Sequence, residues 1–121
     1  EIIVSMIEAA GDVDSGPVYM QKTLYLTGYE LNAEIRKKQA DTTIDMCVEF
    51  VERLCSFNEP VKQVGKESYY TKRTPEDSRL DPLKSIKEQF NLLRIADNDN
   101  YPAFFEIDDH RYVIKIERYK K

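Results

Sequence analysis

Two carboxylates lie in a short, constrained loop near the start of the sequence, where residues 11–17 read G-D-V-D-S-G-P. The side chains of Asp12 and Asp14 can exchange protons with a substrate, so this loop is a candidate location for acid–base chemistry. The glycines and the proline keep the loop from continuing either neighbouring strand, and loops held by a rigid scaffold commonly carry functional residues. The same residue types also form ordinary turns, and the local composition alone favours a purely structural turn.

The other side chains with reactive chemistry give weaker signals. Cys47 and Cys55 lie eight positions apart within one helical pattern, which is too far for a disulfide. The only histidine, His110, lies elsewhere, so neither a zinc site nor a redox pair is predicted, and no metal is expected. We expect two buried, reduced thiols in a cytoplasmic protein. His110 is expected to be a solvated residue at the tip of a turn.

The loop is flanked by two apolar segments, residues 2–7 and 18–26, which indicate β-strands. Because apolar residues occupy nearly every position of the first segment, we expect both faces of this sheet to be covered. The sequence begins directly with that strand and offers few segments that could cover it. We therefore expect the chain to be the later part of a larger α/β domain.

A helix is predicted next. Thr27 and Glu30 have the spacing of a capping box, so the helix is expected to begin there. The pattern lapses near Asp41, which leaves either one helix over residues 28–54, the interpretation we favour, or two helices that meet at Asp41. Apolar residues recur at helical spacing at Ile44, Cys47, Val48, Val51, Leu54 and Cys55. Core packing is expected for Met46, Cys47 and Phe50.

The remainder of the chain predicts an arm, a helix and a hairpin. Residues 61–71 are expected to form an extended, irregular arm, and Thr74 followed by Pro75 predicts a helical turn. A second helix is expected to open at Asp81 and Pro82. Its inward-facing residues are predicted to be Leu83, Ile86, Phe90 and Leu93. Residues 103–107 and 112–117 are expected to pair as a β-hairpin around residues 108–111.

These elements together predict an α+β chain in two parts. Residues 1–58 would hold the strand–loop–strand unit and the long helix or helices. Residues 59–121 would hold the arm, the second helix and the C-terminal β-hairpin, with Asn58 and Glu59 at the boundary. The hairpin would need a partner to be stable, either the preceding helix or a second copy of the chain.

Composition excludes several classes of protein. The 121 residues allow one domain with a modest core, and 33% charged with 41% hydrophobic residues is typical of a globular chain. The net charge of −4 argues against nucleic-acid binding over the whole surface. No apolar run approaches the ~20 residues of a membrane span, and no signal peptide is visible.

The segment V-D-S-G-P-V-Y-M-Q, residues 13–21, resembles the [LV]-D-x-G-x-[IV]-x-x-Q segment of the 10-formyltetrahydrofolate-dependent formyltransferases. In that family this aspartate is catalytic, and the loop before it contacts the folate ring. The resemblance implies that Asp14 is the catalytic carboxylate, that Gly11, Asp12 and Val13 border the pterin, and that 10-formyltetrahydrofolate is the formyl donor.

Three later segments support this resemblance in the same order. Residues 27–50 resemble the helical element that closes the formyltransferase domain. Residues 73–78, R-T-P-E-D-S, resemble the R-T-P-x-D-S segment of enzymes that formylate nucleotide-linked amino sugars. Residues 89–94 with 101–105 resemble the C-terminal helix and hairpin of those enzymes. The resemblance implies the later half of such an enzyme, with a nucleotide-linked amino sugar as substrate. No membrane partner is expected, because no apolar run is long enough to span a membrane.

The sequence also departs from the family. The active site of the family uses an Asn and a His beside an H-x-S-x-L-P segment, and none of these occurs here, so the chain is expected to be inactive alone. Two alternatives stay open. A methionyl-tRNA formyltransferase would need a basic surface, whereas the only basic cluster near the end is Arg118, Lys120 and Lys121. The second alternative is a non-catalytic module that dimerises through the C-terminal hairpin. Which sugar, nucleotide and amine are involved is left open.

Overall fold

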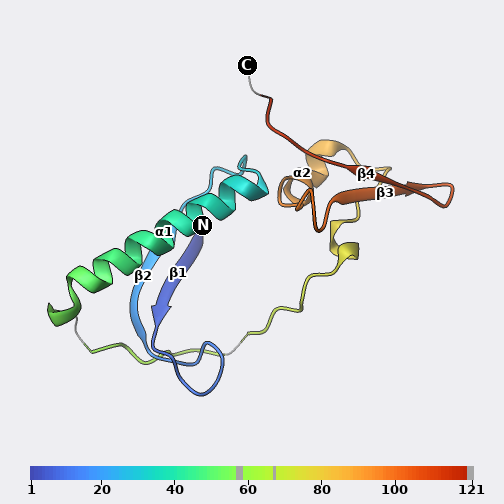
Figure 1. Ribbon diagram of the computed structural model, residues 1–121. Helices are drawn as coiled ribbons and strands as arrows, with labels where there is room; N and C mark the ends of the chain where they lie inside the picture. The colour runs from blue at the N-terminus through green and yellow to red at the C-terminus, as the bar shows by residue number, and fades with distance from the viewer. Residues whose placement is uncertain (57–58, 67, 120–121) are drawn as a thin grey trace. The chain divides into compact units, whose positions relative to one another are not determined.

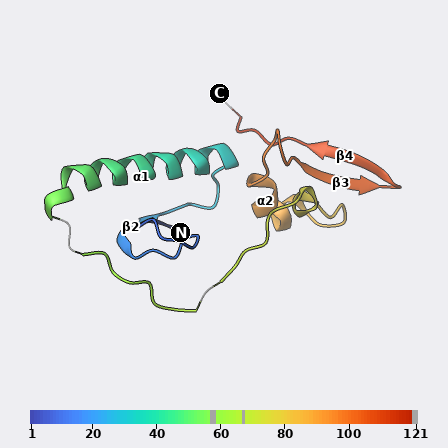
Figure 2. The same cartoon turned by 60° about the horizontal axis from the view of Figure 1, so that its bottom comes forward.

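The computed structural model describes residues 1–56, 59–66 and 68–119 (Figures 1 and 2). The chain is a mixed α+β structure with two small antiparallel sheets, as predicted. Its elements are β1 (Ile2–Ile7), β2 (Val18–Leu24), α1 (Asn32–Glu52), the short 3-10 helices η1 (Leu54–Ser56) and η2 (Pro75–Ser78), α2 (Ile86–Arg94), β3 (Ala103–Ile107) and β4 (His110–Ile114).

These elements form two compact units. Unit 1 comprises Glu1–Leu26 with Arg36–Tyr69, and unit 2 comprises Thr27–Ile35 with Tyr70–Lys121. The predicted division between residues 58 and 59 stays a prediction, and Asn58 lies outside the described residues.

Unit 1 is a β-hairpin with α1 lying along it, as both ribbon views show (Figures 1 and 2). Strands β1 and β2 pair from Ile2–Leu24 to Met6–Met20, and a bulge follows before Ile7. The helix contacts β2 through an ion pair of 2.9 Å between Lys22 Nζ and Glu49 Oε2. An edge-on contact between the Tyr19 and Phe50 rings, 5.3 Å between centroids, adds to it. These contacts fix which face of the hairpin the helix covers.

The other face of the hairpin is open, so the prediction that both faces are covered is wrong for this chain. The side chain of Ile3 is 58% exposed, and exposure alternates along β1. The physical reason is that α1 packs on one face only, and side chains of a strand alternate between faces. The strand β2 also ends at Leu24, two residues earlier than predicted.

Helix α1 is continuous, as favoured from the sequence, but it begins at Asn32 rather than near Thr27. Gly28 has φ +93°, which is incompatible with a right-handed helix. Glu30 still contacts Thr27: the N–H of Thr27 donates to both oxygens of the Glu30 carboxylate, at 3.0 Å to Oε1 and 3.1 Å to Oε2. The predicted contact therefore exists, but it closes a turn before the helix.

The face of α1 that the sequence marked as apolar is exposed. Ile44, Val48 and Val51 are 61%, 51% and 72% exposed, whereas Met46 is 2% exposed. Both thiols, of Cys47 and Cys55, are exposed as well, so the prediction that they are buried is wrong. Spacing reveals an apolar stripe on a helix but not which side faces the neighbouring strands, and here the hairpin meets the side that carries Met46.

Unit 2 has its core between α2 and the second hairpin, made of Leu80, Leu93, Ala96 and Ala103. The helix α2 begins after Ser85, not at Asp81. The Ser85 hydroxyl accepts from the N–H of Glu88, and the Glu88 carboxylate accepts from the N–H of Ser85, which is a complete capping box. Asp81 instead closes a turn by accepting from the N–H of Leu83. Leu83 and Ile86 are consequently 94% and 73% exposed, contrary to prediction.

The second hairpin has a two-residue turn. Asp108 and Asp109 both have positive φ, 48° and 63°, which suits the right-handed twist of the strands. His110 is therefore not at the tip, because it already pairs with Ile107 as the first residue of β4. It is exposed, as expected.

Candidate functional site

The loop that carries Asp14, residues 8–17, is closed at its base and strained at its tip. The N–H of Glu8 donates to the carbonyl of Pro17 at 2.9 Å. Within the loop, the Ser15 hydroxyl donates to the carbonyl of Asp12 at 2.9 Å. Asp14 has φ +55°, a left-handed conformation that aspartate tolerates better than most residues, although it still costs about 1–2 kcal/mol. Residues held in such conformations often lie at functional sites.

Gly16 allows the two sides of this loop to approach each other. A Cβ at this position would lie 1.8 Å from the carbonyl oxygen of Glu8, which is backbone and cannot rotate away. Only glycine fits here. The D-x-G spacing of the sequence thus has a structural cause that is separate from chemistry at Asp14.

A segment from beyond α1 holds the loop from the other side. From here on, "the arm" means residues 59–66, which include the first part of the segment 61–71 that the sequence predicts to be extended. Val18 and Val61 exchange two backbone hydrogen bonds of 2.8 Å, which fixes the arm beside the start of β2. Two residues further on, Gln63 Nε2 donates to the carbonyl oxygens of Asp14 at 2.8 Å and Gly16 at 2.6 Å. Nothing in the sequence indicated Gln63, which lies 49 residues from Asp14.

The open face of the first hairpin is hollowed next to Asp14. The hollow has a volume of about 330 Å³, and its lining combines apolar and uncharged polar residues with one acidic residue, Asp14. Its lining consists of Ile3, Ser5, Ile7, Asp14, Val18, Gln21 and Gln63. Gln21 Nε2 donates to the Ser5 hydroxyl at 2.9 Å, which orients both groups. Apolar residues with a few polar groups are the composition typical of small-molecule sites, and the carboxylate of Asp14, an exposed residue, is the acid–base group of this lining.

The predicted folate-contacting residues lie on the same loop but not in the hollow. Gly11, Asp12 and Val13 are exposed, and Val13 is 92% exposed. The structure thus brings Asp14 to the hollow and leaves the other three at the tip. Their predicted role in binding stays a prediction, as does the catalytic role of Asp14. Among the described residues, no group of three or more His, Cys, Asp or Glu could hold a metal ion.

The segment R-T-P-E-D-S is explained by local structure. The Asp77 carboxylate accepts from the N–H of Thr74 at 2.6 Å and from its hydroxyl at 2.9 Å, which lowers the pKa of Asp77. Ser78 is fully buried, accepts from Arg73 Nη2 at 3.0 Å and donates to the carbonyl of Tyr101 at 3.1 Å. These bonds join the 3-10 turn η2 to the chain just before β3.

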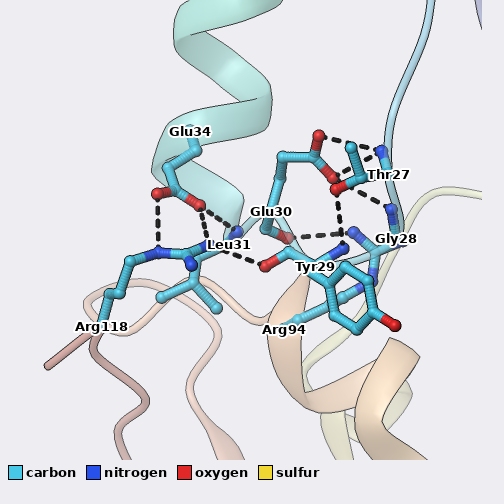
Figure 3. Close-up of polar contacts among 8 residues, drawn as sticks. All are labelled: Thr27, Gly28, Tyr29, Glu30, Leu31, Glu34, Arg94 and Arg118. Carbon is cyan, nitrogen blue, oxygen red and sulfur yellow. Dashed lines mark hydrogen bonds and ion pairs between the residues drawn. The ribbon is translucent and has the colours of Figure 1, made fainter.

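The basic residue near the C-terminus is engaged inside unit 2, as Figure 3 shows. Arg118 donates to both carboxylate oxygens of Glu34, at 3.0 and 2.9 Å, and to the carbonyl of Tyr29 at 2.9 Å. The bond from Arg118, followed by that from the N–H of Leu31, lowers the pKa of Glu34. Arg94 donates to the carbonyl of Glu30 at 2.9 Å in the same network. Lys120 and Lys121 lie outside the described residues.

In the part of the chain that the structure describes, no helix has the length and apolar character needed to cross a membrane.

No protein-family model and no curated protein matches this sequence. Solved structures do. A methionyl-tRNA formyltransferase from Clostridium thermocellum matches with a TM-score of 0.65 at 23% identity, over 90% of this chain and 47% of that one. A 4-N formyltransferase from Francisella tularensis matches with a TM-score of 0.70 at 15% identity, over 97% of this chain and 51% of that one. A Mycobacterium tuberculosis protein described as a candidate sugar N-formyltransferase matches with a TM-score of 0.70 at 15% identity, over 97% of this chain and 54% of that one.

The likeness to these structures is one of fold. This chain has the fold of the formyltransferases, and it spans about half the length of the three structures described above.

Proposed function

We propose that this chain, with its formyltransferase fold, is part of an enzyme that transfers a formyl group from 10-formyltetrahydrofolate to the amine of a nucleotide-linked amino sugar. The observation that carries the proposal is the placement of Asp14, whose loop resembles the family motif and which is one of the residues that line the hollow of unit 1. Support also comes from the fold, which is shared with formyltransferases that act on different substrates.

The proposed role of Asp14 is to move a proton. An amine that attacks a formyl carbon must lose a proton, and the nitrogen that departs must gain one. A carboxylate held at a fixed place beside both groups can relay that proton. Stabilising the negative charge that develops on the formyl oxygen requires other donors, such as the Asn and His of the family motif that this sequence lacks. The intact protein would therefore need those donors from outside this chain.

The lining of the hollow is compatible with the folate donor, which would supply the activated formyl group when bound. Ile3, Ile7 and Val18 offer apolar surface for a flat ring, and Ser5 and Gln21 offer hydrogen-bonding groups for its polar edge. A few polar groups in an otherwise apolar lining are typical of small-molecule sites.

An amino sugar is favoured over tRNA as the formyl acceptor for a reason of charge. Binding tRNA requires cations that are free to contact phosphates. Arg118 instead makes a bidentate ion pair with Glu34, and the chain carries 22 acidic against 18 basic residues. The second candidate, a methionyl-tRNA formyltransferase, has the Clostridium thermocellum structure in its favour. Filter binding of the intact protein to tRNA at moderate salt separates the two, because tight, salt-sensitive binding would favour tRNA.

The test of the proposed function is Asp14→Asn in the intact protein. Asparagine has nearly the same shape and tolerates a left-handed conformation, so the loop is expected to keep its structure. We expect turnover with 10-formyltetrahydrofolate and a nucleotide-linked amino sugar to fall by at least ~10²-fold, as for a lost acid–base group. Asp41→Asn, on the exposed side of α1, is the matched control and should leave turnover unchanged. Near-normal turnover of the Asp14 variant would contradict the assignment.

A further inference from the structure

We infer that Gln63 is a positioning residue for Asp14, an inference that rests on the proposed function. The side chain of Gln63 holds the backbone of the Asp14 loop in its left-handed conformation and thereby sets where the Asp14 carboxylate lies relative to the hollow. Gln63 would then be part of the site, although it contributes no group that reacts.

The contacts of Gln63 are those of a clamp. A single nitrogen, Nε2, donates to the carbonyl oxygens of both Asp14 and Gly16, at 2.8 and 2.6 Å. Both partners are acceptors, so the amide must present its nitrogen to them, and each of its two hydrogens can serve one carbonyl. The clamped carbonyls belong to the residue with φ +55° and to the glycine packed against Glu8. Gln63 therefore contacts the loop at its residue with positive φ and at the glycine that packs against Glu8.

The arm is itself fixed where it meets the loop. Val61 makes two backbone hydrogen bonds of 2.8 Å with Val18, the residue that follows Pro17 and begins β2. Gln63 follows only two residues later, so its side chain starts from a backbone that is tied to the same hairpin. A residue anchored in this way can impose a conformation on the loop rather than follow it.

The consequence for chemistry follows from the strain at Asp14. Without the clamp, the left-handed conformation loses two hydrogen bonds that compensate for its cost, and the loop can relax toward ordinary backbone angles. A relaxed loop displaces the carboxylate, and a displacement of about 1 Å can cost ~10²-fold in rate. Gln63 thus acts through Asp14, and its removal should have no additional effect once the carboxylate is gone.

A double-mutant cycle in the intact protein tests this. Gln63→Leu keeps a side chain of similar size and removes the donors, and we expect kcat to fall by about 10- to 100-fold with little change in KM. The variant with both Gln63→Leu and Asp14→Asn should be no slower than Asp14→Asn alone. Lys62→Gln, on the neighbouring exposed residue, is the control and should behave like the unmodified protein. Normal kcat in Gln63→Leu, or losses that multiply in the double variant, would overturn the inference.

A second measurement separates this inference from the proposed function. The carbonyl ¹³C chemical shifts of Asp14 and Gly16 report on hydrogen bonds to those oxygens whether or not the protein transfers formyl groups. We expect both shifts to change in Gln63→Leu and to stay constant in Lys62→Gln. If the unmodified protein shows no formyl transfer, the proposed function fails, and changed shifts still support the clamp. Unchanged shifts would refute the clamp regardless of activity.

Discussion

The guanidinium of Arg118 and the carboxylate of Glu34 form a bidentate pair between residues 84 positions apart in the sequence. Nε and Nη2 of the arginine each donate to a different oxygen, at 3.0 and 2.9 Å. Parallel bonds of this kind are stronger and more directional than a single contact. The pair fastens the end of the chain to the first turn of α1, within unit 2 (Figure 3).

Glu34→Gln is expected to destabilise unit 2 in a pH-dependent way. The pKa of Glu34 is lowered from its ordinary value of 4.5, mainly by the bond from Arg118, so the unfolded chain binds the proton more readily than the folded one. The contribution of Glu34 is therefore complete above pH 4.5 and is lost as the pH falls through its folded pKa. Melting temperatures should differ most between the two proteins near neutral pH and converge in acid.

Asp41→Asn is the control for that experiment, because Asp41 makes an exposed i,i+4 pair with Lys37 on the same helix. Its melting temperature should follow that of the unmodified protein across the pH range. A Glu34→Gln difference that persists unchanged in strong acid would show that the ion pair is not its cause.

Gly16→Ala is expected to destabilise the chain through the backbone of the Asp14 loop. The added methyl would meet the carbonyl oxygen of Glu8 at 1.8 Å, so the loop must open. Overpacking of this kind typically costs about 1–3 kcal/mol in the free energy of unfolding. Gly11→Ala is a matched change in the same loop, and apart from its own backbone and its two chain neighbours no atom lies within 4 Å of the added methyl. Denaturant unfolding should separate the two, and equal effects would contradict the described loop geometry.

Leucine-to-alanine substitutions at two positions should distinguish the inner from the outer side of the α2 region. Leu93 is 7% exposed in the core of unit 2, whereas Leu83 is 94% exposed in the turn before the helix. We expect Leu93→Ala to lower the free energy of unfolding by about 2–5 kcal/mol. Leu83→Ala should change it by less than about 0.5 kcal/mol. Urea titration of both variants measures this, and a large loss at Leu83 would restore the helix start predicted from the sequence.

Elements whose signals are local were predictable from the sequence. The strands beside the Asp14 loop and the second hairpin follow from periodicity and turn residues. Periodicity also predicts helix in the region of α1, but it lapses near Asp41 and leaves the continuity of that helix open. The start of α2 was missed because two local signals compete. Asp81 with Pro82 resembles a helix start, but Ser85 with Glu88 forms the actual capping box. Both patterns are common in sequences, and in the structure Asp81 closes a turn while Ser85 caps the helix.

Contacts between distant residues were not predictable. Gln63 and Asp14 lie 49 residues apart, and the sequence marks neither glutamine nor arm as part of a site. The same holds for Glu34 and Arg118. The sequence marks Arg118 as part of a basic cluster but gives no sign that Glu34 is its partner. The buried side of α1 was only partly predictable: Met46 is buried as predicted, whereas the apolar stripe that includes Ile44 and Val48 is exposed. Helical spacing defines two sides of a helix, whereas the partner that covers one of them is specified by tertiary structure.

The hydrogen bonds of Gln63 also bear on the order in which the chain folds. Strands β1 and β2 are close in sequence and can pair early. The loop between them reaches its native hydrogen bonding only when Gln63, 49 positions after Asp14, is in place. Closing so long a separation costs entropy that must be overcome before the contact forms, so such contacts tend to come late. During synthesis, a nascent chain that ends before Gln63 would already contain Asp14 but would lack the side chain that donates to the carbonyl oxygens of its loop.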